Sequence, residues 1–129
     1  MDNYNIMIID DEKIVGDMAK MSLEHEGCHV ETFLNGEAAL ARLHEDRFDV
    51  VVTDLKMSGI DGMEVLKTVK ALYPGTKVIM ITAFANLDTA IEALRGDVHD
   101  FFPKPMKIKE LKESIQRASM YRRVPKDLR

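Results

Sequence analysis

Acidic side chains, a threonine and a lysine follow the apolar segments of this 129-residue sequence, and residues of these types can hold a phosphoryl group and a cation. Asp10 and Asp11 follow the first apolar segment, and Asp54 follows the third. Thr82 ends the fourth, and Lys104 comes after the fifth. Carboxylates that cluster raise one another's pKa because their negative charges repel, and a divalent cation relieves this repulsion. Because Mg²⁺ prefers oxygen ligands and commonly binds carboxylates together with phosphate, we predict a magnesium site that also binds a phosphoryl group.

A carboxylate is the expected nucleophile at this site, since neither a cysteine nor a Ser–His pair accompanies these residues. Asp54 is the strongest candidate because it stands alone after the central segment, whereas Asp10 and Asp11 are adjacent and suit metal binding. Lys104 and Thr82, with backbone N–H groups, would hold the phosphoryl oxygens. Each residue alone is more often a helix cap, a turn residue or a surface residue. Their joint occurrence after successive apolar segments is what favours a site.

Short apolar segments alternate with amphipathic ones along the chain, and this alternation predicts the elements that position the site. Residues 6–9, 28–33, 50–53, 78–81 and 101–102 are typical of buried strands, and a helical pattern follows each. The pattern predicts an α/β fold: one doubly wound (βα)5 domain with a five-stranded parallel sheet and helices on both faces. In such sheets ligands bind at the carboxyl ends of the strands, where the candidate residues would meet.

Apolar residues at helical spacing predict one face of each helix. Asn35 and Asn86 are expected to cap the second and fourth helices. The nine methionines are expected mostly at core-facing positions, where methionine fills gaps. The face of the first helix would comprise Ile14, Met18 and Met21, and that of the fourth Leu87, Ala90, Ile91 and Leu94.

Composition and charge exclude several classes of protein. The chain is 46% hydrophobic and 31% charged, typical of one globular domain, and it has no apolar run of the roughly 20 residues that cross a bilayer. The single Cys28 forms no intrachain disulfide, and a cytoplasmic location is expected. Basic residues gather after residue 116, so the remainder is acidic, and we expect no direct nucleic-acid binding by this domain. The apolar pattern predicts a domain over residues 1–121 and a tail or linker over 122–129.

Over residues 4–120 the sequence resembles the receiver domain of two-component response regulators. The matching segments are residues 8–12 (IIDDE), 52–57 (VTDLKM), 59–62 (GIDG), 81–83 (ITA) and 101–105 (FFPKP). The resemblance implies a flavodoxin-like sheet with strand order 2-1-3-4-5. It also implies a phosphorylation-controlled switch that catalyses only its own phosphoryl transfer and dephosphorylation, and so is not an enzyme for a separate substrate.

The resemblance further implies particular roles at the site. Asp54 would accept a phosphoryl group from a histidine kinase or phosphotransfer protein in a reaction that needs Mg²⁺ or Mn²⁺. Asp11, Asp54 and the backbone carbonyl of Lys56 would bind the cation, while Asp10 would act through water. The Lys104–Pro105 peptide bond is expected to be cis.

Further residues are implied to act after phosphorylation. Thr82 and Phe101 occupy the switch positions of the family. Lys56 and Phe84, two residues after Asp54 and Thr82, would lie beside the phosphoryl group and set its lifetime. The changed surface would be that of the fourth helix, fifth strand and fifth helix.

The resemblance also implies that this surface binds the partners of the domain. It would contact an output domain, a partner protein or a second copy of the chain, and no membrane. Residues 82–105 look most like regulators that drive σ54-type ATPase domains. Mixed charges could pair across a two-fold axis on this face; they are Arg95, Asp97, Asp100, Lys109, Lys112 and Glu113.

The sequence departs from the family at three places. Ser58 stands where proline is common, which leaves that loop less constrained. Asp97 and Val98 replace a common Gly-Ala pair, and Phe101 lacks the hydroxyl of a tyrosine.

Three other functions compete with this interpretation. A phosphatase of the haloacid-dehalogenase type needs a second aspartate where this chain has Lys56. A flavin carrier needs a Ser/Thr/Gly-rich loop where this chain has an acidic segment. A phosphorylation-independent interaction domain remains an alternative, disfavoured by the complete acidic set.

Overall fold

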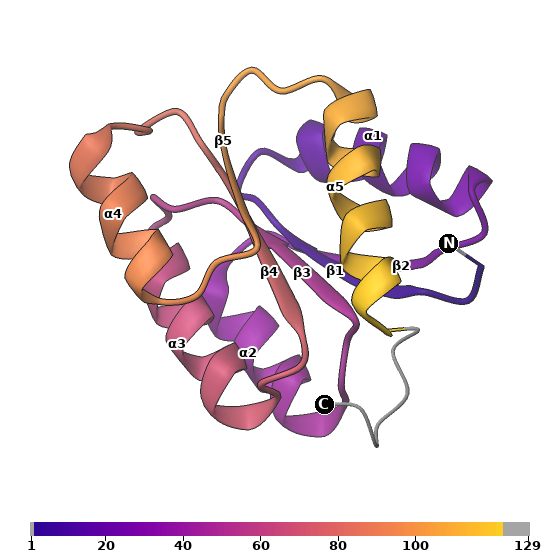
Figure 1. The fold of residues 1–129 in the computed structure, drawn as a ribbon, viewed down its shortest axis with the longest axis horizontal. Coiled ribbons are helices and arrows are strands. Elements are labelled where there is room, and N and C mark those ends of the chain that lie inside the picture. Colours follow the sequence, from indigo (N-terminus) through magenta and orange to yellow (C-terminus); the bar gives the residue numbers. More distant parts are fainter. Residues whose placement is uncertain (1, 123–129) are drawn as a thin grey trace.

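The computed structural model describes residues 2–122, in which five strands alternate with five helices (Figure 1). The strands are β1 (Asn5–Ile9), β2 (His29–Phe33), β3 (Val50–Thr53), β4 (Lys77–Thr82) and β5 (Asp100–Pro103). The helices are α1 (Lys13–His25), α2 (Gly36–Glu45), α3 (Gly62–Leu72), α4 (Leu87–Arg95) and α5 (Ile108–Arg122). None of these helices is long and apolar enough to cross a membrane. The predicted tail lies outside the described residues from residue 123 onward.

All strand pairs are parallel, and the order β2-β1-β3-β4-β5 confirms the predicted fold. Ile9 pairs with Thr53, so the carboxyl ends of β1 and β3 lie side by side. Thr53 in turn pairs with Met80, so β4 continues for two residues until Thr82 pairs with Pro103. The residues that follow β1 and β3 are therefore direct neighbours at one edge of the sheet.

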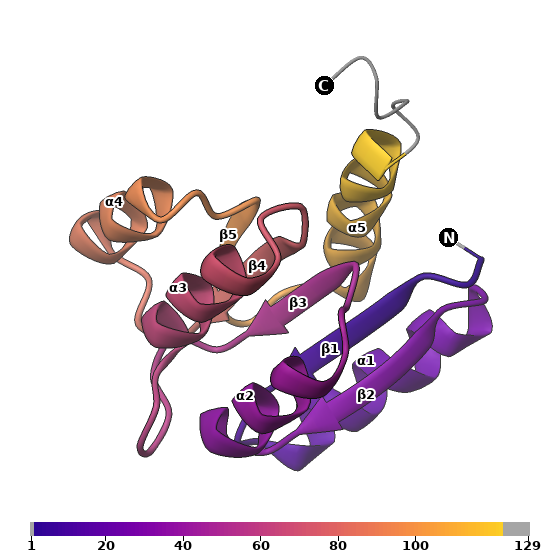
Figure 2. The same ribbon diagram turned by 90° about the horizontal axis from the view of Figure 1, so that it is seen from below.

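The core has two parts because alternate strand residues face opposite sides of the sheet. Met7, Val51 and Met80 belong to a cluster under α2, α3 and α4, whereas Ile6 and Val52 belong to one under α1 and α5. Figure 2 shows these helices on opposite sides of the twisted sheet. Burial of both faces explains why the central strands are continuous apolar runs.

Asparagine and aspartate side chains cap three of the helices. Asn35 accepts a hydrogen bond from Ala38 N–H at 2.8 Å, and Asn86 accepts one from Thr89 N–H at 2.9 Å. Thr89 Oγ1 accepts the Asn86 N–H in return, which completes a capping box. Asp61 caps α3 through the N–H of Glu64. Both predicted caps are confirmed.

The apolar face predicted for α1 points to solvent. Ile14, Met18 and Met21 are 67%, 66% and 75% exposed, whereas the helix buries Gly16, Ala19 and Leu23. The two stripes lie on opposite sides because residues two positions apart are separated by about 200° around a helix. Two of the three buried residues are small, and Gly16 lies next to the side chain of Thr32 on β2.

The predicted face of α4 is also largely exposed. Leu87 and Leu94 are 75% and 68% exposed, and Ile91 is 38% exposed, while Ala93 is the buried residue of the helix.

The expectation that the methionines lie mostly at core-facing positions is only partly right. Met7, Met63 and Met80 are buried, and Met57 and Met106 pack at the core edge, but Met18, Met21 and Met120 are exposed.

Candidate functional site

Two buried carboxylates stand side by side where β1 and β3 end. Asp10 and Asp54 are 6% and 7% exposed. Backbone bonds hold both in the sheet pattern one residue beyond the strands, because Asp10 N–H donates to the carbonyl of Phe33 and Asp54 N–H donates to that of Ile9, each at 3.0 Å. The sheet thus fixes the positions of these two acids more firmly than a free loop would.

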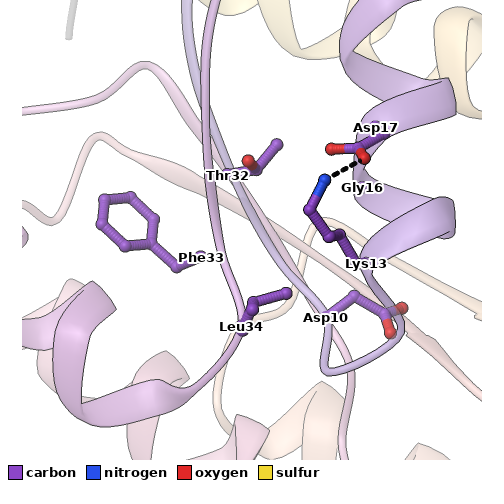
Figure 3. Close-up of a pocket in the computed structure, with 7 residues that line it drawn as sticks. All are labelled: Asp10, Lys13, Gly16, Asp17, Thr32, Phe33 and Leu34. Atoms are coloured by element: carbon purple, nitrogen blue, oxygen red, sulfur yellow. Dashed lines mark hydrogen bonds and ion pairs between the residues drawn. The ribbon is translucent and has the colours of Figure 1, made fainter.

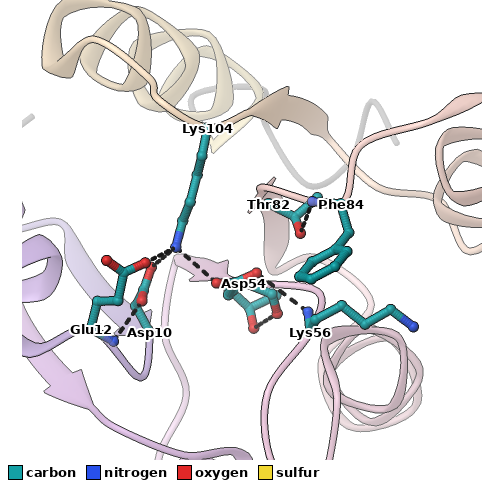
Figure 4. Close-up of polar contacts among 8 residues, drawn as sticks. Asp10, Glu12, Asp54, Lys56, Thr82, Phe84 and Lys104 are labelled. Carbon is teal, nitrogen blue, oxygen red and sulfur yellow. Dashed lines mark hydrogen bonds and ion pairs between the residues drawn. The ribbon is translucent and has the colours of Figure 1, made fainter.

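Lys104 reaches this pair from the loop between β5 and α5 (Figure 4). Its Nζ lies 2.8 Å from Oδ2 of Asp10 and 2.8 Å from Oδ2 of Asp54. It also lies 3.1 Å from Oε1 of Glu12. The Lys104 N–H donates to the carbonyl of Thr82 at 2.9 Å, and the Lys104–Pro105 bond is cis as expected.

Burial and pairing act in opposite directions on the charges of this cluster. Burial raises the pKa of Asp10 above its ordinary value, although hydrogen bonds from Lys104 Nζ and the Glu12 N–H act to lower it. Burial alone would lower the pKa of Lys104, but its bonds to Asp10, Asp54 and Glu12 raise that pKa instead. Lys104 is therefore a permanent cation, while Asp10 is incompletely compensated.

The donor set fits a hard divalent cation. Asp10, Asp11 and Glu12 can each offer one oxygen, and these oxygens lie within 4.8 Å of one another. With Asp54, this edge of the sheet carries four carboxylates and the ammonium of Lys104, so negative charge is in excess. Mg²⁺ takes oxygen ligands of this kind and keeps several waters. Among the described residues the acidic group is thus Asp10, Asp11 and Glu12, and Lys104 pairs with Asp10 and Glu12 of this group as well as with the predicted ligand Asp54.

Thr82 lies at the same edge, but its hydroxyl makes no hydrogen bond to the acids among the described residues. It is fully buried, and its Oγ1 accepts the Phe84 N–H at 3.0 Å. Within residues 2–122 no hydrogen bond joins the Thr82 hydroxyl to Asp54 or to the ammonium of Lys104. Phe84 is 58% exposed, and its ring points toward the segment that carries Asp54 and Lys56 (Figure 4).

The loop after β3 turns back on Asp54. The Lys56 N–H donates to Asp54 Oδ1 at 3.3 Å, while the Lys56 side chain is exposed and extends away from the acids (Figure 4). Phe101 is partly buried against the core under α3 and α4, and it pairs with Met80 on β4. The two predicted switch residues, Thr82 and Phe101, therefore lie on neighbouring strands, with Thr82 two residues beyond the partner of Phe101.

A pocket of about 240 Å³ adjoins the other side of Asp10 (Figure 3). It lies between the start of α1 and the end of β2. Lys13 and Asp17 form an ion pair of 2.6 Å within it. Its lining comprises Asp10, Lys13, Gly16, Asp17, Thr32, Phe33 and Leu34. Of the predicted site residues only Asp10 lines it, so this pocket adjoins the candidate site at that residue alone.

Two contacts of the site lie outside the sequence prediction. Glu12 accepts a hydrogen bond from Lys104, which is far away in the sequence. The one sequence feature that could have pointed to Glu12 is its position two residues after Asp10. Glu37 binds the loop after β3 by accepting the Ile60 N–H at 2.9 Å. No spacing rule links α2 to that loop.

A doubly wound sheet of this order, with acids after β1 and β3 and a lysine after β5, defines the class of receiver-like switch domains. The chain matches the response regulator receiver domain over residues 6–116 and belongs to that family, as the sequence predicted.

Similar proteins fall in the same family. The transcriptional regulatory protein ZraR of Salmonella typhimurium is 33% identical over 119 residues, which are 92% of this chain and 27% of that protein. The chain thus spans about a quarter of the length of that relative. A CheY-like receiver domain from Methanospirillum hungatei has a TM-score of 0.86 at 30% identity, with 89% of this chain and 92% of that chain covered. The beryllofluoride-activated NtrC4 receiver domain dimer has a TM-score of 0.83 at 29% identity, with coverage of 88% and 94%.

Proposed function

We propose that this receiver domain is a phosphorylation-controlled switch in which Asp54 accepts a phosphoryl group from a histidine kinase or phosphotransfer protein. The observation that carries the proposal is the ammonium of Lys104, 2.8 Å from Asp54 Oδ2 at the carboxyl edge of the sheet. A fixed cation beside a buried carboxylate stabilises the charge of an incoming phosphoryl group. The domain acts on itself, in both phosphoryl transfer and hydrolysis.

The chemistry divides among residues of this chain. An oxygen of Asp54 attacks phosphorus, and the bond to the donor's histidine nitrogen breaks with its electron pair on that nitrogen. Lys104 then pairs with a phosphoryl oxygen, and the Thr82 hydroxyl donates to another. Asp11, Asp54 and the Lys56 carbonyl, with Asp10 acting through water, would hold Mg²⁺ or Mn²⁺, which when bound supplies positive charge opposite Lys104.

The test is metal-dependent modification of Asp54 by acetyl phosphate, read by intact-protein mass spectrometry and site mapping. The wild-type chain should gain a phosphoryl adduct with Mg²⁺ and lose that gain with a chelator. Asp54→Ala should gain none, while Asp88→Ala, which removes an exposed carboxylate from the first turn of α4, should behave as wild type. Normal labelling of Asp54→Ala would refute the assignment, and absence of labelling in the wild type would favour a phosphorylation-independent interaction domain.

The output side of the proposal is a packing change transmitted by Thr82. Movement of its hydroxyl toward a phosphoryl oxygen leaves space that Phe101, on the neighbouring strand, can fill. The surface of α4, β5 and α5 then changes, and an output domain, a partner protein or a second copy binds the changed form. Thr82→Ala should still be labelled at Asp54 yet fail to show this change, which the NMR shifts of β5 amides would report.

A further inference from the structure

The loop that joins β3 to α3 is tied to α2 by one carboxylate. Glu37, in the first turn of α2, accepts the Ile60 N–H at 2.9 Å through Oε1. Ile60 lies in the same loop as Lys56 and only six residues after Asp54. We propose that Glu37 is a positioning residue for the phosphorylation site: it holds this loop and thereby sets the affinity of the site for a divalent cation. The inference rests on the proposed function.

Two glycines show how closely the loop and α2 approach each other. Gly59 has a φ of +79°, a conformation that favours glycine, and a Cβ built there would overlap Glu37 Oε1. A Cβ on Gly36 would lie 2.6 Å from the carbonyl oxygen of Ile60. The turn of the loop thus fits directly against the N-terminal turn of α2, with the Glu37 carboxylate between them.

Two backbone N–H groups fix the ends of the loop close to Asp54. The Lys56 N–H donates to Asp54 Oδ1, and the Gly62 N–H donates to the carbonyl of Leu55 at 2.8 Å. Between these anchors stands Ser58, where a proline would have restricted the backbone. Ser58 provides no such restriction. Ile60 packs at the edge of the core, and among the described residues the bond from Glu37 is the only hydrogen bond from another element to residues 56–60.

The charge state of Glu37 strengthens this constraint. The Ile60 N–H and the N–H of Glu37 itself lower the pKa of its carboxyl, so Glu37 is ionised at neutral pH. Hydrogen bonds to an ionised acceptor are roughly twice as strong as neutral ones. Loss of the bond would leave the Lys56 carbonyl with a wider range of positions, and a site with less fixed oxygens binds Mg²⁺ more weakly.

The experiment compares Glu37→Ala and Glu37→Gln with a matched control, Glu64→Ala. Glu64 is an exposed carboxylate in the first turn of the neighbouring helix α3, and its side chain makes no hydrogen bond to the described residues. Mg²⁺ is titrated into each metal-free chain and followed by amide NMR shifts. Initial rates of labelling by acetyl phosphate are measured over the same Mg²⁺ range, and exchange of the Ile60 amide is measured without metal.

We expect Glu37→Ala to raise the Mg²⁺ dissociation constant by roughly tenfold, as loss of a group that supports metal ligands typically does. Its labelling rate should fall at low Mg²⁺ and recover at saturating Mg²⁺, and its Ile60 amide should exchange faster. Glu37→Gln, which keeps an acceptor oxygen, should fall between wild type and Glu37→Ala. Glu64→Ala should match the wild type.

Two failures are distinguishable. If the wild type shows no Mg²⁺-dependent labelling, the proposed function itself fails. If the wild type is labelled normally and both Glu37 variants match Glu64→Ala in Mg²⁺ affinity, the positioning role is refuted. A Glu37→Ala chain that is less stable but binds Mg²⁺ normally also refutes that role, and Glu37→Gln decides the matter if Glu37→Ala fails to fold.

Discussion

The chemistry of the site depends on how a single ammonium is shared among several acids. Lys104 contacts Asp10, Glu12 and Asp54, so none of the three has a counter-ion to itself. Asp10 is almost fully buried, and burial raises its pKa although its hydrogen bond to Lys104 acts to lower it. The site is thus arranged for binding additional positive charge at the expense of stability.

This imbalance predicts that Asp10→Asn is more stable than the wild type at neutral pH in metal-free buffer. The folded-state pKa of Asp10 is raised, so its favourable contribution is fully present below its ordinary value of 3.8 and is lost as pH rises through the folded-state pKa. An asparagine avoids that loss, and we expect a gain on the order of 1 kcal/mol in the free energy of unfolding. Urea unfolding as a function of pH measures it.

The gain should shrink as the pH falls toward 3.8 and disappear below it. Asp88→Asn serves as the exposed control and should change stability little at any pH. A wild type that is the more stable chain at neutral pH would show that Lys104 fully compensates Asp10.

Phe84 gives a second prediction at the scale of one residue. Its exposed ring points toward the segment that carries Asp54, where it would hinder water attacking an aspartyl phosphate. Phe84→Ala should shorten the lifetime of the phosphorylated form several-fold, followed by the decay of the labelled mass after removal of acetyl phosphate. Leu87→Ala removes another exposed apolar side chain and should leave the lifetime unchanged. Equal lifetimes of Phe84→Ala and wild type would mean that the ring does not shield the site.

The residues at the ends of strands were predictable because a parallel sheet brings those ends together whatever its side chains are. This rule correctly placed Asp10, Asp54 and Lys104 in one cluster. It could not find Glu37, whose contact with Ile60 depends on the path of a loop and the reach of one side chain. Thr82 was correctly placed at the edge, but its hydroxyl is used within its own loop.

At the scale of elements, the strands were easier to predict than the orientation of the helices. Strands buried on both faces are continuous apolar runs, whereas a helix can carry two apolar stripes, and its sequence alone does not say which faces the sheet. In α1 the small residues Gly16 and Ala19 face inward and the larger Met18 and Met21 face outward.

Helix α4 depends on its cap more than the other helices do, because Ala93 is its one buried residue. Asn86→Ala removes the acceptor for the Thr89 N–H and should cost about 1 kcal/mol of local helix stability. Amide hydrogen exchange should show faster exchange across α4 with little change in global unfolding.

The matched control is Asn35→Ala, which removes the corresponding cap of α2. Since α2 buries Ala39 and Leu43, its loss of stability should appear in global unfolding instead. The interpretation fails if Asn86→Ala lowers global stability as much as Asn35→Ala does.

For the whole molecule, the face of α4, β5 and α5 combines exposed apolar groups with charges of which several are paired within the domain. Lys112 pairs with Glu26, Asp100 with Arg117, and Asp97 weakly with Lys70. Fewer charges are therefore available for pairing across a two-fold axis than the sequence indicated. The remaining attraction on this face is the exposed apolar surface of α4, which comprises Leu87, Ile91 and Leu94.

We predict that beryllofluoride with Mg²⁺ drives dimerisation through this face. Sedimentation should show a shift toward dimer that Leu87→Asp abolishes. Ile14→Asp, which places the same charge on the exposed face of α1, should dimerise normally. A monomer with and without beryllofluoride at concentrations up to about 1 mM, a binding limit near −4 kcal/mol, would leave only a heterologous partner for this face.

The outward stripe of α1 also gives the molecule a sensitivity to oxidants. Met18 and Met21 present their thioethers to solvent beside Ile14, while Met7 and Met80 are sealed in the core. Peroxide should therefore convert the surface methionines to sulfoxides first, and a sulfoxide is polar where the thioether was apolar. The fold would survive such damage because its core methionines are protected. The α1 surface would lose its apolar character, and reductases that act on methionine sulfoxide would restore it.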